Sequence, residues 1–111
     1  MMNDKELVMY SRTIGCPFIT TAKRVLAEES VAYREIFIDK DAQAKARVIE
    51  WTGFLSVPTL VVTSHGQDLP AGEVTPLERG ASPRGVDRGP MLTEASSGEL
   101  RAWLLKHGFI D

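Results

Sequence analysis

Apolar and polar positions change period along the chain, and these changes predict strands and helices in alternation. Leu7–Tyr10 is a short apolar run, and Val31–Ile38 alternates and is rich in β-branched and aromatic residues, so both are predicted strands. Pro58–Val62 is a continuous apolar run, which indicates a central strand buried on both faces. The pattern therefore predicts three strands in the first part of the chain.

Two predicted helices lie between these strands. The first begins at Pro17, because a proline lacks only an N–H that the first helical turn leaves unpaired. Asp39 or Asp41 can cap the second, and Gly53 stands where that helix should end. Apolar residues recur at helical spacing in the first helix, at Phe18, Ala22, Val25 and Leu26, and the second has Ala42, Ala46 and Ile49 on one face.

A third predicted helix stands near the end of the chain and has the clearest boundaries. Ser96 and Glu99 have the spacing of a capping box, and Gly108 stands where a C-terminal cap belongs. Its expected buried positions are Leu100, Trp103 and Leu104. Strands that alternate with helices of this length predict one α/β domain over residues 1–111, with its first two strands parallel.

Residues 64–93 differ in composition from the rest of the chain, because glycines and prolines recur throughout them. We treat them as a long insertion before the last helix. A structureless loop of this length is rare inside a compact domain, so part of it should be ordered. Glu73–Gly80 is the expected strand, and Pro76 would confine that strand to a sheet edge.

Composition excludes several classes of function. The net charge of -2 gives no basic surface for nucleic acid or an anionic membrane, and no apolar segment is long enough to span a bilayer. The opening residues include acidic side chains, so we expect no secretory signal and a cytoplasmic location. A single cysteine excludes an internal disulfide and a cysteine-rich metal site, and no metal is expected.

Cys16, the only cysteine, directly precedes the first predicted helix. The unpaired N–H groups and the positive end of the helix dipole favour a thiolate at this position, and the thiolate is the nucleophilic form. Arg12, four residues earlier, can add a further positive charge. The alternative interpretation is that Cys16 is a small buried apolar residue, as free cysteines often are.

Three segments together resemble the glutaredoxins, which have the thioredoxin-like fold of a mixed central sheet flanked by helices. The segments are "MYSRTIGCPFITTAKRVL", "VAYREIFID" and "WTGFLSVPTLVV", and the resemblance covers residues 5–63. The first resembles the family's Y-S-x-x-x-C-P-[FY] motif with one more residue before the cysteine, as Y-S-x-x-x-x-C-P-F at residues 10–18, and the third contains a T-V-P-like element at residues 56–58. The order and spacing of these elements carry the resemblance.

This resemblance implies a glutathione site. Cys16 matches the cysteine that attacks a glutathione mixed disulfide, and Phe18 follows it within the same motif. Val57-Pro58 matches a dipeptide with a cis proline, which leaves the Val57 backbone free to pair with the peptide of glutathione. Arg12 lies near the family's basic residue for a glutathione carboxylate, although an ordinary solvated arginine is an equal alternative.

The family's acidic turn before the last helix has its nearest equivalent in "RGVDRG", residues 84–89. The resemblance then implies that Asp87 holds the γ-glutamyl ammonium, and that Gly85 and Val86 offer N–H groups to the glutamyl carboxylate. The long insertion before this segment weakens the alignment. Asp87 as an ordinary turn-former is the competing interpretation.

The largest departure from the family is Ile19, which stands where dithiol members have a second cysteine. The resemblance therefore implies a monothiol route, in which Cys16 takes a glutathionyl group and a second glutathione removes it. Expected partners are glutathione and glutathionylated proteins or small mixed disulfides, bound by a monomer. Two alternatives stay open: a [2Fe-2S] carrier, whose usual C-G-F-S motif differs here at Pro17 and Ile19, and a non-catalytic adaptor that docks through residues 64–93.

Overall fold

A mixed four-stranded sheet with helices on both faces forms the body of the protein. The computed structural model describes residues 5–111. The strand order is β2-β1-β3-β4; β1 and β2 are parallel, while β3 is antiparallel to both of its neighbours. The elements are β1 (Lys5–Ser11), α1 (Pro17–Glu28), β2 (Arg34–Phe37), α2 (Ala42–Thr52), β3 (Thr59–Ser64), β4 (Met91–Thr93) and α3 (Ser97–Lys106). This arrangement confirms the predicted thioredoxin-like fold and the parallel first pair of strands.

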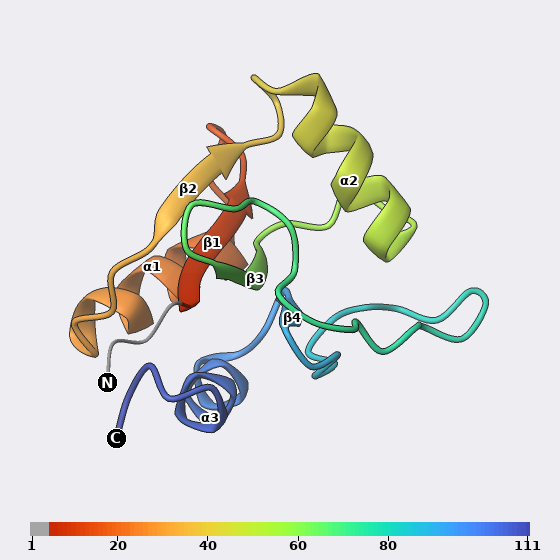
Figure 1. Ribbon diagram of the computed structural model, residues 1–111. Coiled ribbons are helices and arrows are strands. Elements are labelled where there is room, and N and C mark those ends of the chain that lie inside the picture. The colour runs from red at the N-terminus through yellow and green to blue at the C-terminus, as the bar shows by residue number, and fades with distance from the viewer. Residues whose placement is uncertain (1–4) are drawn as a thin grey trace.

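The two faces of the sheet are covered by different helices, as Figure 1 shows. Successive strand residues point to opposite faces, so Leu7 and Met9 of β1 pack with α1 and α3, whereas Val8 and Tyr10 pack with α2. β1 and β3 occupy the centre of the sheet and are buried along most of their length. The continuous apolar run at β3 therefore marks a central strand, as predicted.

The helix boundaries confirm most of the predicted caps. Pro17 is the first residue of α1, and the Asp41 carboxylate, rather than that of Asp39, accepts from a first-turn N–H of α2. Gly53 ends α2 in the left-handed conformation. The Ser96–Glu99 capping box is formed at α3. These caps fix where α1 begins, after β1, and where α2 ends, before β3.

The buried face of α2 differs from the prediction. The structure buries Ala44, Val48 and Thr52, whereas the predicted stripe was Ala42, Ala46 and Ile49, and Ile49 is 44% exposed. Several alanines in one helix allow more than one apolar stripe, so the helical period alone does not select the face. Packing of Ala44 and Val48 beneath β1 and β3 selects it.

Residues 65–90, here called the β3–β4 connection, join two antiparallel neighbours, and the teal part of this connection extends away from the sheet (Figure 1). The predicted strand at Glu73–Gly80 is wrong, because among the described residues this stretch has no strand pairing. Pro76 has no N–H to donate, and Thr75 makes one backbone bond, to the Arg88 carbonyl. The edge beside β3 is instead taken by Met91–Thr93, a run too short for a sequence pattern to reveal.

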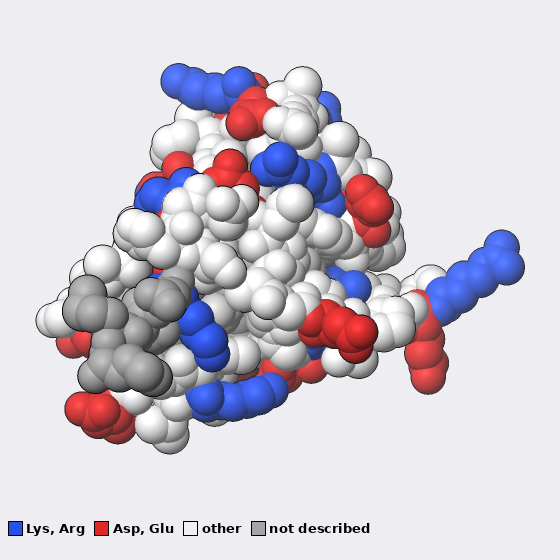
Figure 2. Space-filling view, in the orientation of Figure 1, with Lys and Arg blue, Asp and Glu red and all other residues white. Residues whose placement is uncertain are grey.

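Charge is mixed on the surface shown in Figure 2, where Lys or Arg side chains lie among Asp or Glu side chains. None of the helices in the described part of the chain is long and apolar enough to cross a membrane. The expectation of no secretory signal rests partly on residues 1–4, which lie outside the described residues.

Candidate active site

Cys16 occupies the N-cap position of α1, directly before Pro17. Its backbone is extended, and its carbonyl accepts the first helical hydrogen bond, from the Thr20 N–H at 3.0 Å. No side chain caps this helix, so the first-turn N–H groups of Phe18 and Ile19 lack an intrahelical partner. The half-buried sulfur therefore stands where donors and the positive end of the helix dipole favour a negative charge.

The start of β3 forms the opposite side of the site. The Val57-Pro58 peptide bond is cis, as the resemblance implied. The Cys16 Sγ lies 3.8 Å from the Val57 carbonyl oxygen and can donate its thiol proton to it. Within residues 5–111 the Val57 N–H has no hydrogen-bond partner. The backbone beside the sulfur thus keeps a donor that can pair with a second peptide.

A further pair of charged side chains lies beside this centre. The Arg84 guanidinium stands over the Phe18 ring at 4.8 Å from its centroid, and its Nη2 lies 3.3 Å from the Glu94 carboxylate. Glu94 follows β4 with a positive φ of 46°, and its N–H donates to the Pro58 carbonyl at 2.9 Å. Phe18, Pro58, Arg84 and Glu94 therefore form one connected rim.

Within residues 5–111, the Arg12 guanidinium makes no hydrogen bond to a residue of this rim. Its Nε donates to the Ile14 carbonyl at 3.1 Å within the same loop. The side chain lines a cavity of about 190 Å³ together with Asp39, Lys45 and Leu55. Because Arg12 is exposed, the positive charge that the sequence predicts near Cys16 stands on the outer side of the loop.

Gly85, Val86 and Asp87 precede β4 and are engaged in bonds of their own. The Gly85 N–H donates to the Thr93 carbonyl, and the Val86 N–H donates to the Pro83 carbonyl. The Asp87 carboxylate binds the Lys106 ammonium at 2.8 Å and accepts from the Gly89 N–H. Burial alone would raise the pKa of Asp87, but these two partners outweigh it, so the pKa is lowered.

The structure brings Cys16, Phe18, Val57 and Pro58 together, whereas Asp87 lies against the last turn of α3. The predicted role of the 85–87 segment in glutathione binding stays a prediction. No group of three His, Cys, Asp or Glu side chains suited to a metal ion occurs among residues 5–111.

The glutaredoxin family model matches residues 7–66, which is more than half of the chain. The protein belongs to the glutaredoxin family. The match contains Cys16 and the Val57-Pro58 dipeptide but ends at Gly66, before the rim residues Arg84 and Glu94. Residues 7–66 are called the glutaredoxin part below, and most of the β3–β4 connection lies outside the family match.

One protein is similar to this chain in sequence, and one solved structure is similar to it in fold. The chain is 29% identical over 94 residues to chloroplastic glutaredoxin-C4 of rice, Oryza sativa subsp. japonica, and the alignment covers 82% of this chain and 65% of that protein. The chain thus spans just under two thirds of the rice relative. The crystal structure of a buckwheat glutaredoxin–glutathione complex superposes with a TM-score of 0.51 at 18% identity, covering 98% of this chain and 84% of the buckwheat chain, and it supports the fold.

Sequence reasoning missed Arg84 and Glu94 as neighbours of the site. Arg84 is the first residue of "RGVDRG", and Glu94 precedes the last helix. Their placement depends on the Pro58–Glu94 backbone bond and on the parallel bridge between Arg84 and Thr93. Neither long-range contact leaves a signal in the local pattern.

Proposed function

We propose that this glutaredoxin is a glutathione-dependent monothiol oxidoreductase that reduces glutathione mixed disulfides through Cys16. The observation that carries the proposal is the position of the lone sulfur, at the N-terminus of α1 and 3.8 Å from the Val57 carbonyl. A thiolate there can attack a disulfide, and the Val57 backbone can hold an incoming peptide in strand fashion.

The reaction has two thiol–disulfide exchanges. In the first, the Cys16 thiolate attacks the glutathione sulfur of a mixed disulfide; the substrate leaves as a thiolate and takes a proton from water. In the second, a glutathione thiolate attacks the glutathionyl sulfur on Cys16, which restores the Cys16 thiolate and releases glutathione disulfide. Over both steps, the mixed disulfide and one glutathione become the substrate thiol and glutathione disulfide. The substrate sulfur is reduced, the sulfur of the second glutathione is oxidised, and the glutathionyl sulfur stays at the disulfide level throughout.

The monothiol character follows from Ile19. This side chain is 4% exposed and packs in the same apolar cluster as Val57, so a branched aliphatic residue fills the place of a second thiol. Because Cys16 is the only cysteine, the second exchange requires a thiol from outside the chain. Glutathione is the thiol that we propose.

Glutathione binding in this proposal uses the free Val57 N–H and the Val57 carbonyl beside Pro58, with Phe18 as an apolar wall. Arg12 and the 85–87 segment are the proposed partners of the glutathione carboxylates and ammonium. The engaged N–H groups of Gly85 and Val86 would have to exchange their present acceptors to take part.

The experiment that tests the function is turnover of a small glutathione mixed disulfide, coupled to glutathione reductase. The native chain should turn over, and Cys16→Ser should lose essentially all activity because no other thiol can replace the nucleophile. Ser64→Cys in the Cys16→Ser background is the control, because it restores an exposed thiol away from the N-terminus of α1 and should not restore turnover. No turnover by the native chain, with glutathione binding retained, would favour the adaptor alternative.

Asp87 is tested separately by Asp87→Ala, with Lys106→Met as its matched control. Each variant breaks the same surface ion pair, but only the first removes the carboxylate proposed to bind glutathione. If Asp87 binds the γ-glutamyl ammonium, glutathione affinity falls several-fold in Asp87→Ala and stays unchanged in Lys106→Met. Equal affinities in both variants would assign Asp87 a structural role alone.

A further inference from the structure

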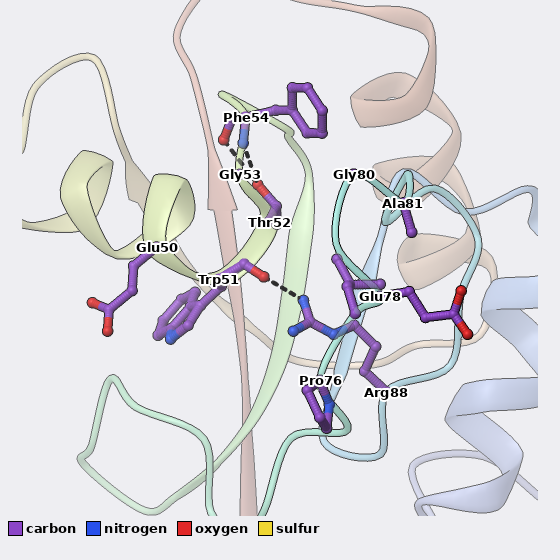
Figure 3. A pocket seen from close by; sticks show the side chains of 11 residues that line it. Glu50, Trp51, Thr52, Gly53, Phe54, Pro76, Glu78, Gly80, Ala81 and Arg88 are labelled. Carbon is purple, nitrogen blue, oxygen red and sulfur yellow. Dashed lines mark hydrogen bonds between the residues drawn. The ribbon is translucent and has the colours of Figure 1, made fainter.

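A cavity of about 490 Å³ lies outside the Cys16 centre, between the end of α2 and the β3–β4 connection. Its volume falls in the range of pockets that bind small organic groups, roughly 300–1,000 Å³. Figure 3 shows the Arg88 side chain between Trp51 on one side and the 76–81 segment on the other. The lining residues used below are Trp51, Phe54, Pro76, Leu77, Ala81 and Arg88.

Arg88 is 6% exposed, yet its guanidinium has no carboxylate partner within residues 5–111. Its Nε donates to the Thr75 carbonyl at 2.8 Å, and its Nη1 donates to the Trp51 carbonyl at 2.6 Å and lies 3.5 Å from the Met91 sulfur. Its Nη2 donates to no acceptor of the described residues. The guanidinium therefore has hydrogen-bonding capacity left for a group inside the cavity.

The buried charge of Arg88 is only partly compensated. The Trp51 carbonyl belongs to the last turn of α2, so the negative end of that helix offsets part of the charge. A buried cation without a full counter-charge is costly, and burial accordingly lowers the pKa of Arg88. Glu50 and Glu78 also line the cavity, but Figure 3 shows their carboxylates turned away from the guanidinium.

The walls around this cation are mainly apolar. Trp51 is half-buried, Phe54 is 53% exposed, and Pro76 and Leu77 come from the facing segment. An exposed phenylalanine beside a cavity favours an apolar occupant, since covering its ring removes apolar surface from water. The cavity thus suits a ligand with an apolar or aromatic body and one carboxylate.

The cavity continues toward Cys16. A second cavity of about 360 Å³ shares Phe54 and Gly80 with the first and is lined also by Ser56 and Arg84. Ser56 precedes Val57, and Arg84 stands over Phe18. The two cavities therefore form one groove that begins at Arg88 and ends at Ser56 and Arg84, the neighbours of Val57 and Phe18 in the Cys16 centre.

We propose that this groove is a docking site for a polypeptide substrate, and that it binds an apolar residue next to a carboxylate, with the carboxylate on Arg88. The choice of a disulfide substrate as the source of that peptide rests on the proposed function. The binding site itself rests on the buried cation, the apolar walls and their continuity with the Cys16 centre.

The test compares two probe peptides, N-acetyl-Phe-Glu-amide and N-acetyl-Phe-Gln-amide, in which only the carboxylate differs. Binding to the native chain is followed by NMR at the Arg88 Nε–H and the Trp51 indole N–H. The acidic peptide should bind at least about fivefold more tightly, because a hydrogen bond to a charged partner contributes more than a neutral one. Equal affinity, or shifts that do not include Arg88 and Trp51, would overturn the proposal.

Three variants identify the source of any preference. Arg88→Met should abolish the difference between the two peptides, whereas Arg79→Met, which removes an exposed arginine of the same connection that does not line the cavity, should preserve it. Ala81→Glu keeps Arg88 but adds a carboxylate at the cavity wall, so it should weaken the acidic peptide alone and covers the case in which Arg88→Met misfolds. A preference that survives Ala81→Glu would contradict the proposal.

Turnover of a small mixed disulfide separates this proposal from the function on which it partly rests. Ala81→Glu should leave that turnover unchanged, because the change lies outside the Cys16 centre. Peptide binding without turnover in the native chain would overturn the oxidoreductase and keep the docking site. If the native chain turns over the small mixed disulfide but does not prefer the acidic peptide, the docking site is overturned and the oxidoreductase is kept.

Discussion

The glutaredoxin part of the chain and the β3–β4 connection are held in place in different ways. Strands β1 and β3 pair over six positions and bury nearly every side chain, with helices packed on both of their faces. The connection instead touches the sheet through three isolated bridges, Thr63–Pro70, Arg84–Thr93 and Asp87–Leu92, and a few single hydrogen bonds. Burial of apolar surface stabilises the first region, while local polar contacts shape the second.

These polar contacts gather at the end of the connection nearest β4. Gly89 is the centre of this anchor, since its carbonyl lies 2.8 Å from both the Trp103 indole nitrogen and a ring nitrogen of His107. Arg88, one residue earlier, reaches the end of α2. One short stretch therefore joins the connection to helices on both faces of the sheet.

The largest expected effect is on the free energy of unfolding, and it is measured with a matched pair of leucines, one in each region. Leu60→Ala, at 2% exposure in β3, should lower the free energy of unfolding by about 2–5 kcal/mol, because it removes buried atoms and leaves a cavity. Leu69→Ala, at 51% exposure in the connection, should change it by less than about 0.5 kcal/mol. Denaturant titration measures both, and similar losses would refute the contrast.

A pair of glycines distinguishes the anchored end of the connection from its outer part. Gly89 has a φ of +83°, and an added Cβ would meet the Glu73 carbonyl oxygen at 3.3 Å, so Gly89→Ala should cost about 1–2 kcal/mol. Gly72 has neither constraint, and Gly72→Ala should be neutral or slightly stabilising. Thermal unfolding of both variants tests this. A Gly72→Ala chain as unstable as Gly89→Ala would mean that the whole connection is tightly packed.

The smallest expected effect is a pH dependence at the anchor. Burial lowers the pKa of His107 below its ordinary value of 6.5, so the folded chain favours the neutral imidazole. Its contribution to stability is complete above pH 6.5 and is lost as the pH falls through the folded-state pKa. His107→Phe should therefore show a shallower loss of stability between pH 7 and pH 5 than the native chain. Equal slopes in the two chains would exclude His107 as a contributor.

Sequence reasoning succeeded where one local signal has one structural meaning. Pro17 marked the start of α1, Ser96 and Glu99 marked that of α3, and the run ending at Val62 marked a central strand. The cis peptide before Pro58 was also anticipated, through the resemblance to glutaredoxins rather than through any local rule. These features include the residues that surround Cys16.

The sequence was insufficient where several partners compete for one segment. The stretch at Glu73–Gly80 has strand-like composition, but β4 occupies the edge beside β3. No local pattern marks Arg88 for burial, and only the packing of the connection against α2 buries it. The position of Asp87 against Lys106 likewise depends on how residues 65–90 fold back onto α3. Each of these outcomes depends on contacts between residues far apart in the sequence.

The central claim is that the N-terminus of α1 makes Cys16 a nucleophile, and the alkylation rate of Cys16 tests this most directly. Iodoacetamide is added at pH 6 to the folded chain and to the same chain unfolded in urea, so that only the surroundings of the thiol differ. We expect the folded chain to react at least about tenfold faster, because helix N–H groups and the helix dipole favour the thiolate. An equal or slower rate in the folded chain would contradict the account.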